Sequence, residues 1–89
     1  MNIFILDGTR MTSKKATHKY IASILRLPDH YGGNLDALAD CLGEYNELTT
    51  IILLNSDKIR DNLEDYGVSL IETFQDLSQG EHRYSLIIK

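Results

Sequence analysis

Residues 27–44 read LPDHYGGNLDALADCLGE, and they combine a loop with the start of an amphipathic helix. The loop contains the only proline of the chain and two adjacent glycines. Asn34 stands where a helix N-cap is expected, because its side-chain carbonyl can accept from the first helical N–H groups. Apolar residues then recur at positions 35, 38, 42 and 45, which is helical spacing. We therefore predict a helix that begins at Leu35 and packs its apolar side into the core.

The opposite side of this helix carries a column of acidic residues, Asp36, Asp40 and Glu44. Like charges at i and i+4 destabilise a helix by about 0.2–0.5 kcal/mol per pair. Asp36 lies in the first turn, where the helix dipole favours a negative charge, but Asp40 lies in the helix interior. A solvated helix face is the ordinary interpretation of such a column. The charge distribution along the chain argues for a binding surface instead.

Charge is segregated along the sequence, whose net charge is −4. Residues 1–26 contain five bases and one acid, whereas residues 27–57 contain six acids and no Lys or Arg. Such a block of one sign predicts a surface that meets a positively charged partner. The bases of the first helix lack interleaved exposed aromatics, so we interpret them as a solvated face and expect no nucleic-acid partner.

Length and composition indicate one domain spanning residues 1–89, with 43% hydrophobic residues. The single cysteine, Cys41, cannot form an internal disulfide and is interpreted as a small core residue. The apolar opening at residues 3–6 is too short for a signal peptide, and no run approaches the ~20 apolar residues of a membrane span. We expect a soluble cytoplasmic protein with no membrane partner.

Apolar strands and helices alternate along the chain in the order β-α-α-β-α-α-β, which predicts an α/β fold with a small parallel sheet. The strands are expected at 2–6, 49–54 and 84–88, and the helices at about 13–25, 35–44, 57–63 and 68–79, with a turn at Tyr66-Gly67. The strands show no alternation, which is typical of strands buried on both faces. The residues expected to be almost inaccessible are Ile3, Ile5, Ile51, Leu53 and Ile87.

The central motif is Tyr31-Gly32-x-Asn34-Leu35-Asp36-Ala37-Leu38-x-Asp40-Cys41-Leu42, preceded by Leu27-Pro28. It resembles the barstar family, the intracellular inhibitors of the secreted ribonuclease barnase. The likeness extends along the chain through Phe74, Gly80 and the Ile-Ile final strand. It implies a barstar-like fold with a three-stranded parallel sheet, the first strand central, packed with about four helices. It also implies that the loop and second helix plug a ribonuclease active site, without catalysis or a cofactor.

The resemblance assigns roles to particular residues. Asp40 corresponds to the main phosphate mimic, Asp36 to a second ionic contact, and Asp76 to a family glutamate that pairs with the partner. Carboxylates can replace phosphates there because a ribonuclease site presents Arg and Lys. The expected partner-binding set is His30, Tyr31, Gly32, Asn34, Leu35, Asp36, Ala39, Asp40, Gly43, Glu44 and Asp76.

Two departures from the family pattern remove aromatic surface from this set. His30 stands where the family has an aromatic residue, and Ala39 stands where it has tryptophan. Aromatic residues are frequent interface anchors. We therefore expect a basic ribonuclease partner other than barnase, or weaker binding, with the chain monomeric before it binds.

Alternative functions remain open at this point. The first is an immunity or binding module of the same fold whose partner is another basic protein or toxin. The second is a flavodoxin-like phosphoacceptor domain with Asp7 after the first strand, although that fold needs five strands. A metal site of His30, Asp36 and Asp40 is conceivable, but the histidines of the chain show no metal-ligand spacing, and we expect no metal. We find no nucleophile elbow, so we do not expect an enzyme.

Overall fold

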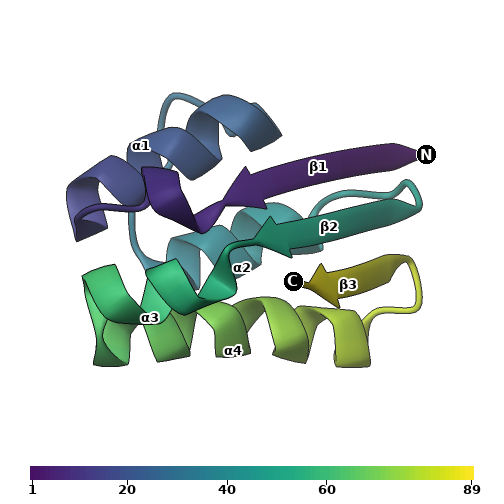
Figure 1. Cartoon of the computed structure of the whole chain (residues 1–89). Coiled ribbons are helices and arrows are strands. Elements are labelled where there is room, and N and C mark those ends of the chain that lie inside the picture. The colour runs from purple at the N-terminus through teal and green to yellow at the C-terminus, as the bar shows by residue number, and fades with distance from the viewer.

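Three parallel strands and four α-helices alternate along the chain in a computed structural model that describes all 89 residues (Figure 1). A single 3₁₀ turn follows the first strand. The elements are β1 (Asn2–Asp7), the 3₁₀ turn (Gly8–Arg10), α1 (Lys14–Leu25), α2 (Leu35–Gly43), β2 (Thr49–Leu54), α3 (Ser56–Leu63), α4 (Asp65–Gly80) and β3 (Tyr84–Ile88). The α/β fold, the three parallel strands and the four helices are as predicted. No helix has the length and apolar character that a membrane crossing requires.

The middle strand of the sheet is β2, because the strand order is β1-β2-β3. Ile52 lies opposite Ile5 of β1 and Ile87 of β3, and both pairings are parallel. The expectation that the first strand is central is therefore wrong. The physical reason lies in the two crossover connections, from β1 to β2 and from β2 to β3. Each of them moves the chain by one strand in the same direction across the sheet. Right-handed crossovers that move in one direction place all their helices on one face of the sheet.

The other face of the sheet has no helix on it. Figure 1 shows α2 behind the strands, with α1 beside β1 and α4 beside β3. Ile3, Ile5 and Ile87 point to the open face and are 60%, 50% and 42% exposed, so the prediction that they are inaccessible is wrong. Ile51 and Leu53 point toward the helices and are buried, as predicted. The sequence of a continuously apolar strand does not indicate whether helices cover one of its faces or both.

The hydrophobic core lies between the covered face of the sheet and the helices. Leu38 and Leu42 of α2 are fully buried in it, and Leu35 is half-buried, which confirms the predicted apolar side of this helix. The same cluster contains Leu6, Ile51 and Leu53 of the sheet, Ile21 and Leu25 of α1, Ile59 of α3, and Leu70, Ile71 and Phe74 of α4. Burial of α2 on one side therefore leaves its acidic side facing outward.

The boundary between α3 and α4 differs from the prediction of a turn at Tyr66-Gly67. The helix break occurs at Glu64, whose φ of 55° lies in the left-handed region, and α4 already begins at Asp65. Gly67 is inside α4, where it allows close approach of α3. A Cβ at this position would lie 2.4 Å from the backbone oxygen of Ile59. The glycine therefore serves helix packing and not a turn.

Substituting Gly67 with alanine tests this packing. The new methyl group must push α3 and α4 apart, so we expect Gly67→Ala to lower the free energy of unfolding by about 2 kcal/mol or more. Gly80→Ala is the matched control, because nothing lies within 4 Å of the position that its new methyl group would take. The control should be neutral or slightly stabilising. Equal stability of the two variants in urea denaturation would contradict the close contact.

Candidate partner-binding surface

The N-terminus of α2 is built as the sequence predicts. The side-chain oxygen of Asn34 accepts from the Ala37 amide at 2.8 Å, and Asn34 itself is extended, with φ −137°. Gly33 precedes it with φ +69°, a backbone conformation that favours glycine. Asp36 lies in the first turn of the helix, where the dipole favours its charge. This cap fixes where α2 begins and therefore which residues face outward.

The acidic column of α2 lies on the surface without compensating cations. Asp36, Asp40 and Glu44 are all exposed. The structure contains two ion pairs, Lys58 with Asp61 and Arg83 with Glu81, and neither includes a residue of the column. Three carboxylates spaced along one helix therefore present their charge to solvent.

A groove of about 410 Å³ lies between α2 and α4, next to this column. Asp36 and Ala39 line it from α2, and Asp76 lines it from α4. The remaining lining residues are Leu35, Thr73, Leu77, Gly80 and Glu81. The structure thus brings Asp76 into the same groove as Asp36, although 40 residues separate them in sequence. Only the family resemblance predicts a role for Asp76, because no local sequence pattern distinguishes this residue.

The loop before α2 is anchored by a histidine that no local sequence pattern marks as a contact. His18 of α1 is 5% exposed and lies between two tyrosine hydroxyls. Its Nδ1 is 2.5 Å from the Tyr31 hydroxyl in the loop, and its Nε2 is 2.6 Å from the Tyr66 hydroxyl of α4. A neutral imidazole has one donor and one acceptor nitrogen, so one tyrosine donates to it and the other accepts from it.

Burial determines the protonation states of His18, Tyr31 and Tyr66, which we call the His18 cluster. It raises the pKa of Tyr31 to about 12, and the neighbouring Tyr66 adds to the rise. It also lowers the pKa of His18 from its ordinary value of 6.5, because an imidazolium would lose its hydration there. The cluster is therefore neutral near pH 7. Tyr31 is half-buried, and its hydroxyl points toward His18.

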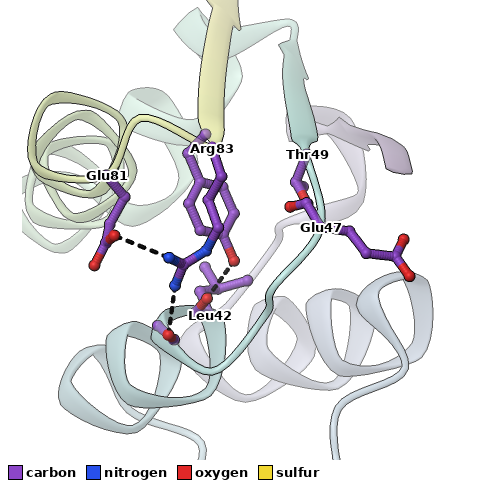
Figure 2. A network of polar contacts seen from close by, with 7 residues as sticks. Leu42, Glu47, Thr49, Glu81 and Arg83 are labelled. Carbon is purple, nitrogen blue, oxygen red and sulfur yellow. Dashed lines mark hydrogen bonds and ion pairs between the residues drawn. The ribbon is translucent and has the colours of Figure 1, made fainter. Parts of the chain in front are cut away.

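The C-terminus of α2 is held by the first residue of β3 and by the turn before this strand (Figure 2). The Tyr84 hydroxyl donates to the Leu42 carbonyl, and Arg83 Nη2 donates to the Gly43 carbonyl at 2.6 Å. Burial raises the pKa of Tyr84 to about 12, so its hydroxyl keeps the proton that it donates. The helix is therefore fixed at both ends by segments distant in sequence.

The remaining predicted residues lie around α2 without forming one pocket. His30, Gly32 and Asn34 are exposed in the loop, and Gly43 is exposed at the helix end. A second groove, of about 630 Å³, lies between this loop and α1, and Tyr31 is part of its wall. The surface is therefore an acidic helix side with a groove beside it, and not an enclosed cavity.

Two of the alternative chemistries find no support in the geometry. No group of three or more His, Cys, Asp and Glu side chains is placed to hold a metal ion, so His30, Asp36 and Asp40 do not form a metal site. The sheet has three strands and not the five of a flavodoxin-like domain. Asp7 accepts hydrogen bonds from Asn55, at the start of α3, and from Thr9 in the 3₁₀ turn, and these bonds lower its pKa.

Comparison with known proteins identifies the class to which this fold and surface belong. Residues 1–88 match the family described as Barstar (barnase inhibitor). A Bacillus subtilis (strain 168) protein named "Putative ribonuclease inhibitor YrdF" is 32% identical over 80 residues, which cover 89% of this chain and 88% of that protein. The chain is therefore a member of the barstar family.

The His18 cluster predicts a pH dependence of stability. The unfolded chain takes up a proton near pH 6.5, whereas folded His18 resists it because its pKa is lowered. The free energy of unfolding should therefore fall as the pH decreases through 6.5, by at most about 1.4 kcal/mol per pH unit, until the folded pKa is passed. Urea denaturation between pH 8 and pH 5.5 measures this loss.

Two variants separate this effect from other titrations. His18→Gln should be less stable than the parent at pH 8. Between pH 8 and pH 5.5 its free energy of unfolding should fall by less than the parent's, because the contribution of His18 is absent. His82→Gln removes a histidine at an exposed position and is the matched control. If His18→Gln loses as much stability on acidification as the parent does, the buried cluster is not its source.

Proposed function

We propose that this chain inhibits a basic ribonuclease by covering its active site with α2, the loop before it and the α2–α4 groove. The observation that carries the proposal is the set of uncompensated carboxylates, Asp36, Asp40 and Asp76, on two helices that share a groove. The name of the Bacillus subtilis relative and the family membership support a ribonuclease as the target. The chain acts by binding, and its function requires no bond-making step.

Phosphate mimicry gives these carboxylates a physical role. A ribonuclease must hold the phosphates of RNA with Arg and Lys, and carboxylates form short charge-assisted hydrogen bonds with both. Asp40 lies in the middle of the exposed side of α2, so a partner that covers this side of the helix would meet it centrally. Asp36 and Asp76 act together from the two walls of the groove. We expect the chain to be monomeric and cytoplasmic when it meets this partner.

A different basic protein is the second candidate partner. Ala39 is half-buried and leaves the groove beside it unfilled, and His30 is exposed in the loop. A partner that fits this surface must fill space that an aromatic residue would otherwise occupy. A ribonuclease with a larger side chain at this point satisfies the condition, as does a basic toxin. Titration against barnase and against ribonucleases of the source organism distinguishes them, since a toxin-specific chain leaves all of these enzymes active.

Replacing Asp40 with alanine tests the mimicry directly. The charge is unpaired and sits mid-helix beside like charges, so the variant should be as stable as the parent or more stable by a few tenths of a kcal/mol, roughly. Binding should weaken by about 2 kcal/mol or more, because partner cations are left buried without a counter-ion. This is the hot-spot range of protein interfaces, and its upper end was measured on a barstar aspartate.

Asp29→Ala is the control, because it removes the same charge from the loop outside the helix. Both variants change the long-range field equally, so their difference in affinity isolates the local contact. Thermal melting and a binding titration on the two variants provide the readout. Asp40→Ala binding as tightly as the parent would rule out the assigned role, and so would weak binding that results only from unfolding.

The segregated charge predicts salt-sensitive association. Exposed charges more than about 8 Å apart are screened at physiological ionic strength. Association with a basic ribonuclease should therefore slow by about tenfold or more between low and high salt, whereas dissociation should change much less. Stopped-flow mixing at several salt concentrations measures both rates. A nearly constant association rate would contradict electrostatic steering by this surface.

A further inference from the structure

The turn between α4 and β3 places an arginine between two elements of the proposed surface. Arg83 Nη1 lies 3.0 Å from a carboxylate oxygen of Glu81, and its Nη2 lies 2.6 Å from the Gly43 carbonyl oxygen. Figure 2 shows the guanidinium between the turn and the end of α2. One planar group therefore joins the C-terminus of α2 to the turn that follows α4.

The contact with Gly43 places a positive charge at the C-terminus of α2. The last turn of this helix contains no basic residue. The carbonyls at a helix C-terminus have no partner within the helix and carry partial negative charge. A cation from another segment satisfies one of these carbonyls and offsets the charge. Arg83 thus stabilises the end of a helix whose acidic column makes it unfavourable in isolation.

The contact with Glu81 changes the charge of the groove. Glu81 lines the α2–α4 groove together with Asp36 and Asp76. Of these three carboxylates, only Glu81 is in an ion pair, and its partner is Arg83. Arg83 therefore compensates one carboxylate of the groove and leaves the other two uncompensated.

The geometry depends on the two-pronged shape of the guanidinium. Arg83 Nε is buried and has no hydrogen-bond partner, which is unfavourable in a folded protein. A lysine would provide a cation without this stranded N–H group, but its single ammonium cannot reproduce the planar fork that reaches two acceptors at once. The arrangement therefore indicates that the planar, two-pronged shape of the Arg83 guanidinium matters, and not its charge alone.

We propose that Arg83 is a positioning residue of the partner-binding surface, which fixes the C-terminus of α2 and masks Glu81 so that Asp36 and Asp76 carry the groove's charge. This rests on the proposed function, because the masking matters only toward a basic partner. The fixing of α2 is a property of the free chain.

Hydrogen exchange on the free chain tests the fixing of α2. The amides of Glu44 and Tyr45 bond back to the last turn of the helix and report on its opening. Arg83→Met and Arg83→Lys should speed their exchange by about tenfold, whereas Glu81→Gln should leave it unchanged. The amides of Ile51 and Leu53 in β2 should stay protected in all variants, which shows that the fold is intact. Parent-like exchange in Arg83→Lys would show that charge alone suffices and would overturn the role of the fork.

Binding kinetics test the masking of Glu81. With the ribonuclease that the parent inhibits as the probe, Arg83→Met should associate roughly two- to fivefold faster at low salt and dissociate about tenfold faster. Arg83→Lys keeps the charge, so its association rate should stay near the parent's while its dissociation rate rises. A purely structural role would raise dissociation only, and an unchanged association rate in Arg83→Met would overturn the masking.

Glu81→Gln gives the reciprocal test, because its dissociation rate should stay within about twofold of the parent's. A rise comparable to that of Arg83→Met would show that Glu81 contacts the partner directly and is not masked. Failure of the parent chain to bind any ribonuclease would refute both the proposed function and the masking. The exchange measurement decides the fixing of α2 in either case.

Discussion

The direction of the two crossovers is the constraint on which the surface depends. Both crossovers move the chain the same way across the sheet, so their helices lie on one face, and α2 packs beside α4. Asp36 belongs to the first crossover and Asp76 to the second, and they share a groove for this reason. With the first strand in the middle, the crossovers would lie on opposite faces and would separate these residues. The exposed isoleucines of the open face are the other consequence of this topology.

The proposed surface also requires that α2 be held in a fixed position, because the charges on its exposed side repel each other. The helix is capped locally by Asn34, and the loop before it is tied to α1 and α4 through His18. Its other end is tied to β3 by Tyr84 and to the α4–β3 turn by Arg83. Carboxylates held in this way do not need to be ordered on binding, and such preorganisation lowers the entropic cost of association.

Helix positions and the parallel sheet could be predicted from sequence, whereas the strand order and the contacts between distant residues could not. The cap at Asn34 and the buried side of α2 follow from residue spacing, and both are present. The strand order depends on the direction of the crossovers, which the sequences of the strands do not indicate. His18 and Arg83 were missed as anchors because their partners lie 13 to 48 residues away in sequence, and no local pattern marks them. Asp76 came from family resemblance alone.

Inhibition kinetics at varied RNA concentration test most directly whether the chain occupies the place of RNA phosphates. The measurement uses the purified chain and the ribonuclease of its source organism, with barnase as a second enzyme. Phosphate mimicry predicts competitive inhibition, in which the apparent KM rises with inhibitor concentration and kcat stays constant. A fall in kcat at unchanged KM would mean that the chain binds away from the substrate phosphates, and it would contradict the role assigned to Asp36, Asp40 and Asp76.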